Sequence, residues 1–209
     1  LITLSTVIYS LSIPNFYTSE SILASSDSKE LKNFSQYSGL ASLAGISLPG
    51  SSNNSVIEVM EIIKSREFVK HLLTFDRILP SLMAPDYYDL EKHVLVFNRD
   101  IYDSEADIWA EDNNMSLKPS YLEAHRIYTD DIMSISQDNK TGLVTISVQH
   151  ISPSFASEFL KLIITEANNL KRQKDILIAE KALDFLKLEL AQTSLVEIKK
   201  SINQLIKAQ

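Results

Sequence analysis

The chain has 209 residues, with no cysteine and only four glycines, and its formal net charge is −7. Apolar residues make up 44% and charged residues 22%, a composition typical of a globular protein with a substantial core. The acidic balance and the dispersed lysines and arginines argue against nucleic-acid binding, which needs clustered basic residues. The lack of cysteine excludes thiol catalysis, disulfides and cysteine-based zinc sites. The scarcity of glycine argues against glycine-rich nucleotide loops.

The first residues of the chain are uncharged and apolar. No charged residue occurs before Glu20, and Leu, Ile, Val and Tyr dominate residues 1–13. A membrane-spanning helix needs about 20 apolar residues, and the sequence starts at Leu1 and not at Met. We therefore expect residues 1–13 to be the outer end of a transmembrane helix, with Tyr9 and Tyr17 suited to the membrane interface. A buried N-terminal strand or helix is the alternative.

Residues 14–152 combine helical and strand patterns, which predicts an α/β domain of the α+β kind. Their first half predicts a strand at 16–24, a short helix at 31–37, a close-packed small-residue segment at 38–46, a loop at 48–54 and helices at 54–63 and 65–73.

Residues 80–117 are the least regular part, with one expected strand at 94–97. They also carry an acidic patch: Asp100, Asp103, Glu105, Asp107, Glu111 and Asp112. Carboxylate oxygens suit Ca²⁺, but the patch lacks the alternating aspartate order of a calcium loop. A solvated loop is therefore the favoured interpretation.

The next segment predicts a helix followed by a β-hairpin. Pro119 opens the helix, and Ser120 with Glu123 forms a capping-box pattern. Strands at 132–137 and 143–150 flank a turn-forming sequence at 138–142. The alternation in the second strand places Val144, Ile146 and Val148 on one face, which we expect to be buried.

A long helix dominates the C-terminal part. Ser152 is a candidate N-cap and Pro153 the first helical residue, and no glycine or proline follows before Thr193. About 40 helical residues make an arm of about 60 Å. A second capping-box pattern at 194–197 predicts a break, followed by another helix through Ile206.

The long helix is the expected site of self-association. Between residues 176 and 190 its apolar residues spread around more than one face, so the helix needs partners on two sides. The candidate oligomer interface consists of Phe159, Ile163, Leu170, Arg172, Leu183, Leu186 and Leu190.

No pattern for catalysis or cofactor binding is present in the sequence. The four histidines share no metal-ligand spacing, and no phosphate-binding loop or nucleophile elbow occurs. We therefore expect no catalytic, cofactor-binding or metal-binding residues, and a protein that is not an enzyme. A pair of carboxylates is a spatial arrangement, and the sequence leaves it open.

Several segments, taken in their order along the chain, carry a resemblance to a known family. They are the strand at 16–18, the small-residue stretch 39–46, Ser65-Arg66-Glu67-Phe68, the hairpin at 140–148, Ser152-Pro153, Asn168, Arg172, 182–190 and Leu205-Ile206. Together they resemble the bacterial polysaccharide co-polymerases, the Wzz-type chain-length determinants of lipopolysaccharide O-antigen. The resemblance covers nearly the whole chain and is strongest over 36–75 and 137–209. Each motif is short, so their order and spacing carry the resemblance.

The resemblance implies a protein of the inner membrane. A periplasmic base domain at 14–152, with a small mixed sheet and flanking helices, would lie between two transmembrane helices. The arm at 153–209 and its return helix would rise from that base in a ring of protomers. Such proteins regulate the length of a polymer that a separate polymerase makes on a lipid carrier, and have no active-site residues. Residues 81–118 match no family pattern, and the second transmembrane helix and the proline-rich stretch before it are not in this sequence.

The sequence leaves three alternative functions open. One is a capsule or exopolysaccharide export co-polymerase that works with a tyrosine kinase. Another is a periplasmic adaptor of a secretion or efflux system, which also carries long helices. The third is an envelope hydrolase, which would need a carboxylate pair in a pocket.

Overall fold

The computed structural model describes residues 15–24, 52–113 and 115–192. The expected elements at 1–13, 31–46 and 194–206 therefore lie outside the described residues. The described residues form two compact units. The first contains residues 15–24 and 60–166, and the second contains residues 52–59 and 167–192. The two helices α4 (Ser52–Lys64) and α8 (Pro153–Gln192) run from one unit into the other.

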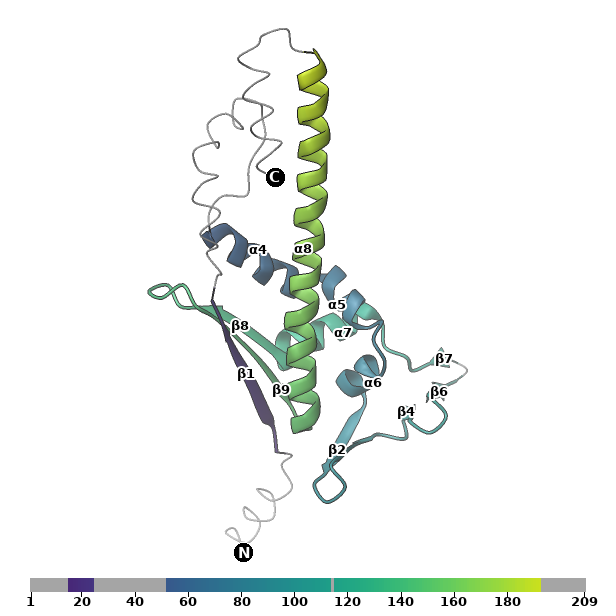
Figure 1. Cartoon of the computed structure of the whole chain (residues 1–209). Helices are drawn as coiled ribbons and strands as arrows, with labels where there is room; N and C mark the ends of the chain where they lie inside the picture. Colours follow the sequence, from purple (N-terminus) through teal and green to yellow (C-terminus); the bar gives the residue numbers. More distant parts are fainter. Residues whose placement is uncertain (1–14, 25–51, 114, 193–209) are drawn as a thin grey trace, which may run out of the picture. The chain divides into compact units, whose positions relative to one another are not determined.

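The largest sheet of the first unit has three antiparallel strands. Its order is β1 (Tyr17–Leu23), β9 (Val144–His150) and β8 (Met133–Gln137), with β9 in the centre (Figure 1). The expected hairpin pairs Gln137 with Val144, and β1 pairs with the other edge of β9. A mixed sheet was the wrong expectation, because every strand pair in the described residues is antiparallel. Residues 138–143 join β8 to β9, and so short a connection allows only antiparallel pairing.

The alternation of β9 forms one side of the core, as the sequence predicted. Val144, Ile146 and Val148 are buried, while the residues between them are half-buried or exposed. A strand places successive side chains on opposite faces, so this pattern leaves one face for the core and one for solvent. The buried residues of the helices complete this core: Ile63, Phe68, Val69, Leu72, Ile78, Leu82, Ala124, Tyr128, Ala156, Phe159, Leu160 and Ile163.

Local caps define where the helices of the first unit begin. Ser65 accepts a hydrogen bond from the Phe68 amide at 3.2 Å and starts α5 (Arg66–Leu72). Ser120 and Glu123 form the predicted capping box of α7 (Tyr121–Ile127). A π-helical turn, η1 (Tyr128–Ile132), then leads into β8. Its buried Tyr128 donates a hydrogen bond to the Ile63 carbonyl at 3.2 Å and so joins η1 to α4.

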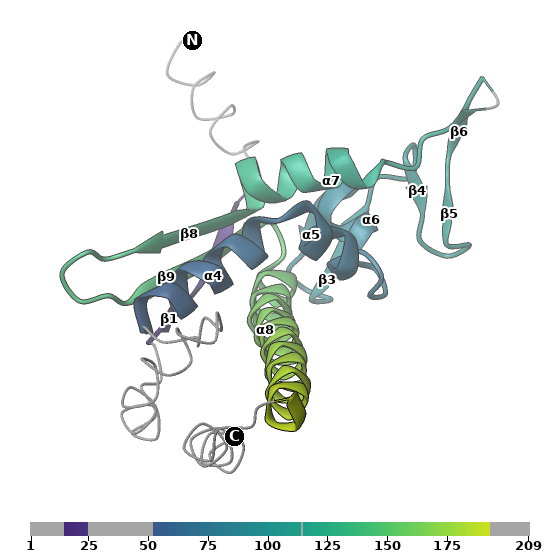
Figure 2. The same ribbon diagram turned by 90° about the horizontal axis from the view of Figure 1, so that it is seen from above.

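Residues 78–116 contain more structure than the sequence predicted. A short helix, α6 (Ile78–Met83), precedes the hairpin of β2 (Pro85–Asp89) and β3 (Val94–Phe97). Two further hairpins consist of β4 (Tyr102–Asp103) with β5 (Ile108–Trp109), and β6 (Glu111–Asp112) with β7 (Met115–Ser116). Figure 2 shows these last hairpins extending beyond α6 and α7.

These hairpins have a small core of their own. Ala84, Phe97 and Tyr102 are buried, and Trp109 packs against them. The Tyr102 hydroxyl donates to a carboxylate oxygen of Asp107 at 2.5 Å. Burial, followed by this carboxylate, raises the pKa of Tyr102 to about 12. The side chain therefore remains a neutral hydrogen-bond donor that closes the β4–β5 turn.

The helix α8 begins where the sequence predicted. Pro153 is its first residue, and the Ser152 hydroxyl accepts the Phe155 amide at 3.2 Å as the N-cap. The helix has 40 residues, which corresponds to about 60 Å. With its antiparallel sheets and separate helices, the chain is an α+β protein with a long C-terminal helix. Within the described part of the chain, no helix combines the length and the apolar character of a membrane span.

Candidate functional site

The first part of α8 belongs to the core and not to a free surface. Phe159 and Ile163 are 1% and 0% exposed. Phe159 stacks on Phe155 with ring centroids 5.1 Å apart and meets the edge of Tyr128 at 6.1 Å. Both candidate interface residues are therefore covered by their own chain, and we remove them from the expected interface.

The remaining candidate residues differ in exposure. Leu170 and Leu183 are half-buried and Arg172 is exposed. The side chains of Leu186 and Leu190 lie outside the described residues. The structure thus leaves Leu170, Arg172 and Leu183 as accessible members of the predicted set.

An exposed apolar surface begins at residue 176, and sequence reasoning did not name its members as interface residues. Its large side chains are Ile176, Leu177, Ile178, Phe185 and Leu188, which are 49%, 50%, 41%, 39% and 61% exposed. The seven-residue spacing of Ile176 and Leu183, which Leu190 continues in the sequence, was the available signal.

These residues lie on two sides of the helix. Ile176 and Leu183 are seven residues apart and share one side. Ile178 and Phe185 have the same spacing and lie about 200° around the axis from the first pair. A polar strip of Gln173, Glu180 and Lys187, all exposed, borders the first pair about 20–60° from Ile176, and Ala179 and Ala182 lie between the two pairs on the opposite arc. Exposed apolar surface of this extent is typical of interaction sites.

Ion pairs fix α4 to α8 within the second unit. Glu58 of α4 pairs with Lys171 at 3.3 Å and also with Lys174. The hydrogen bond from Lys174 is the main cause that lowers the pKa of Glu58. Lys171 also pairs with Asp175, and its side chain is only 12% exposed. These pairs occupy a different part of the helix from the apolar residues after 175.

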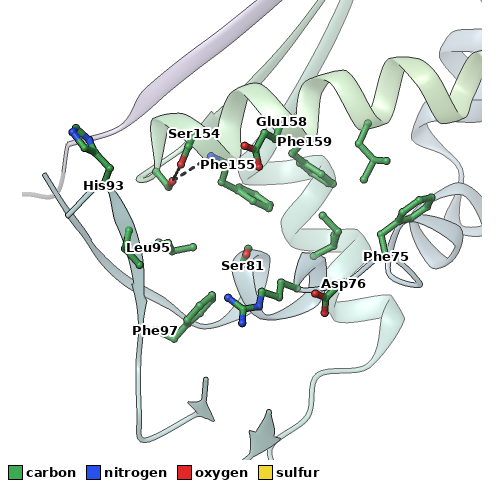
Figure 3. Close-up of a pocket in the computed structure, with 15 residues that line it drawn as sticks. Phe75, Asp76, Ser81, His93, Leu95, Phe97, Ser154, Phe155, Glu158 and Phe159 are labelled. Carbon is green, nitrogen blue, oxygen red and sulfur yellow. Dashed lines mark hydrogen bonds between the residues drawn. The ribbon is translucent and has the colours of Figure 1, made fainter. Parts of the chain in front are cut away.

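A cleft in the first unit is the second candidate site. Its volume is about 520 Å³, and it lies between α6, β3 and the first turns of α8. Leu95 and Phe97 of β3 face Phe155 and Phe159 of α8 across the opening (Figure 3). Phe75, which precedes α6, lies at the opposite end from Leu95.

Two carboxylates line this cleft, as a hydrolase would require. They belong to Asp76 and Glu158, and Arg77 and His93 are the other ionisable lining residues. All four side chains are exposed. A carboxylic acid that protonates a leaving group at neutral pH needs an apolar, buried surrounding. Neither Asp76 nor Glu158 has a buried surrounding.

The four histidines lie apart and have different partners. His71 bonds to Glu166 at 2.6 Å, and His125 bonds to the Lys64 carbonyl at 2.9 Å. His93 is exposed at the β2–β3 turn. His150 is buried; it accepts the Ser152 amide at Nδ1, and its Nε2–H donates to the Ser81 carbonyl. Two backbone partners thus hold His150 as a neutral imidazole.

This arrangement makes folding stability depend on pH. Burial lowers the pKa of His150 below its ordinary value of 6.5. Below about pH 6.5 the unfolded chain binds a proton that the folded chain does not, so stability falls as pH decreases toward the lowered pKa. We expect the urea midpoint to decrease from about pH 7 to about pH 5, and to decrease less in His150→Gln, which cannot be protonated. Equal pH dependence in both proteins would contradict this role.

Two carboxylates of the acidic patch, Asp103 and Asp107, accept hydrogen bonds within their own turns. Asp103 accepts the amides of Glu105 and Ala106, and the Ala106 amide is the main cause that lowers the pKa of Asp103. Asp107 accepts the Tyr102 hydroxyl. Among the residues that the structure describes, no three histidine or acidic side chains are grouped so that they could hold a metal ion. Asp103 and Asp107 therefore stabilise turns as hydrogen-bond acceptors.

Comparison with models of known protein families gave no match, and comparison with curated protein sequences gave no significant match. The resemblance to the polysaccharide co-polymerases therefore stays a prediction from the sequence.

Proposed function

We propose that this chain is a non-enzymatic, self-associating scaffold that regulates the length of a bacterial surface polysaccharide made by a separate polymerase. The observation that carries the proposal is the exposed apolar surface of α8 after residue 175, where a 40-residue helix presents Ile176 and Leu183 on one side and Ile178 and Phe185 on another.

Apolar side chains on opposite edges of α8 support a ring of protomers. In a closed ring, one surface of a protomer contacts a different surface of the next. A helix with a single apolar side would suit a two-fold dimer, whereas two sides about 200° apart can contact two neighbours. The polar strip of Gln173, Glu180 and Lys187 lies beside the Ile176 and Leu183 pair and is exposed.

The polysaccharide and membrane parts of the proposal depend on the family resemblance. That resemblance predicts a protein of the inner membrane with a periplasmic domain, a polymerase partner and a lipid-linked polysaccharide. The uncharged, apolar residues 1–13 support a membrane attachment. In such a protein no group needs to act chemically, because the number of copies around a polymerase can set the length of its product.

The experiment that tests the proposal separates a scaffold from an enzyme. We expect single alanine substitutions of His71, His93, His125, Asp103 and Asp107 to leave the length distribution of the surface polysaccharide unchanged, because none acts on the polymer. His150 is left out because its burial makes alanine structurally disruptive. The measurement is the gel ladder of surface polysaccharide from cells that express each variant. If one substitution abolishes length control in a folded, assembled protein, the scaffold proposal fails.

A further inference from the structure

The frame of the cleft in the first unit is conformationally strained. Among the described residues, four other than glycine have positive φ, and two of these, Arg77 (57°) and His93 (55°), line the cleft. Such backbone conformations are uncommon for residues other than glycine, aspartate, asparagine or histidine, so Arg77 is the unusual one of the two, and residues of this kind concentrate at functional sites. Arg77 stands directly before α6 and His93 directly before β3, so each fixes an element that borders the cleft.

The ionisable side chains of the cleft have few contacts in the described part of the chain, where Asp76 and Arg77 act on Tyr102 only through their charges. Within the described residues, the side chains of Asp76, Arg77, His93 and Glu158 form no ion pair or hydrogen bond. By contrast, the buried hydroxyl of Ser152 and the ring of His150 are both satisfied. Polar groups are thus available at the rim, above an apolar floor.

The chemistry of the cleft limits what can bind there. Two carboxylates and one guanidinium disfavour a phosphate or another strong anion. The charged rim disfavours a purely apolar ligand such as an acyl chain. A neutral ligand with many hydroxyl groups and apolar ring faces meets both requirements. Its hydroxyl groups can donate to Asp76 and Glu158 and accept from Arg77, and different rings of it can pack on Phe75 at one end of the cleft and on Leu95 at the other.

We propose that this cleft binds a short segment of a neutral oligosaccharide. Its volume of about 520 Å³ lies in the usual range of ligand sites and admits roughly two to three pyranose rings. This inference rests on the proposed function and extends it, because the cleft would hold the polymer itself while α8 holds the neighbouring protomers. Asp76, Arg77 and Glu158 are then binding residues, with Phe75 and Leu95 supplying the apolar contact.

Titration calorimetry and saturation-transfer NMR of the whole protein test the inference. The probes are neutral trisaccharides of glucose, galactose, mannose and N-acetylglucosamine, with the acyclic polyol sorbitol as a control. At least one trisaccharide should bind with a Kd of about 1 mM or lower, and sorbitol should not bind. The Asp76→Asn/Glu158→Gln variant should bind it at least about tenfold more weakly, because charged hydrogen-bond acceptors are replaced by neutral groups.

The matched control is Asp131→Asn/Glu180→Gln, which makes the same charge change at exposed residues outside the cleft and should bind like the unmodified protein. Phe75→Leu should also weaken binding, because it removes the flat ring while keeping an apolar side chain. Absence of binding at about 10 mM, equal affinity in the cleft variant or equal binding of sorbitol would overturn the inference. An assembled, length-regulating protein that fails to bind sugar overturns this inference alone, whereas a monomeric protein overturns the proposed function.

Discussion

Leu183→Lys is expected to weaken self-association by about a hundredfold and to abolish the preferred polysaccharide length. Leu183 is half-buried and shares one side of α8 with the exposed Ile176. Covering a lysine there without a partner costs about 3 kcal/mol or more through desolvation of its charge, and each 1.4 kcal/mol corresponds to about tenfold in affinity. Polymer synthesis should continue, because the polymerase is a separate protein. The two measurements are light scattering of the purified protein in mild detergent and the gel ladder of surface polysaccharide.

The control for this substitution is Gln173→Lys, which adds the same charge on the polar strip of the same helix. It should leave both assembly and the ladder unchanged, because an exposed lysine keeps its hydration. Leu186→Lys makes the same change three residues further along the helix. If the Leu183→Lys variant and the Gln173→Lys variant assembled equally well, this side of α8 would not be an interface. An unmodified protein that stays monomeric at micromolar concentration would contradict the ring itself.

Phe159→Ala is expected to lower the free energy of unfolding by about 3–5 kcal/mol. The side chain is 1% exposed, and it packs between Phe155 and Tyr128. Removing the ring loses its burial and leaves a cavity that the neighbouring rings cannot fill. Since a domain is stable by only about 5–15 kcal/mol, the loss should be evident in urea denaturation.

Phe185→Ala, the same change on the same helix, is the matched control. Phe185 is 39% exposed, so its removal should cost the protomer much less while weakening assembly. The two phenylalanines therefore separate folding from association. If Phe159→Ala left protomer stability unchanged and impaired only assembly, its assignment to the core would be wrong.

Local signals explain why part of the fold followed from the sequence. The capping box of Ser120 and Glu123, the N-caps at Ser65 and Ser152, and the start of α8 at Pro153 are all present as predicted. Each depends on hydrogen bonds within a few residues, which sequence neighbours alone decide. The helix α4 starts at Ser52, two residues before the predicted start at residue 54, which is the usual uncertainty of helix ends.

Apart from the strand predicted at 94–97, which is β3, residues 78–116 gave no comparable signal. The strands β4 to β7 have two residues each, too few for a hydrophobic alternation to appear. Their turns depend on side chains such as Asp103 and on the pairing of Tyr102 with Asp107. The sequence could not predict the cleft either, since Asp76 and Glu158 are far apart in the chain and line one cleft only because of tertiary packing.

The sequence by itself determined the length and start of α8, the β8–β9 hairpin and the buried face of β9, because periodicity and capping are local properties. Only the tertiary structure decided which apolar residues of α8 are available. Phe159 and Leu188 are both large apolar residues of one helix, yet they are 1% and 61% exposed. Periodicity gives the direction of a side chain around the helix axis, whereas burial depends on whether another element covers that position.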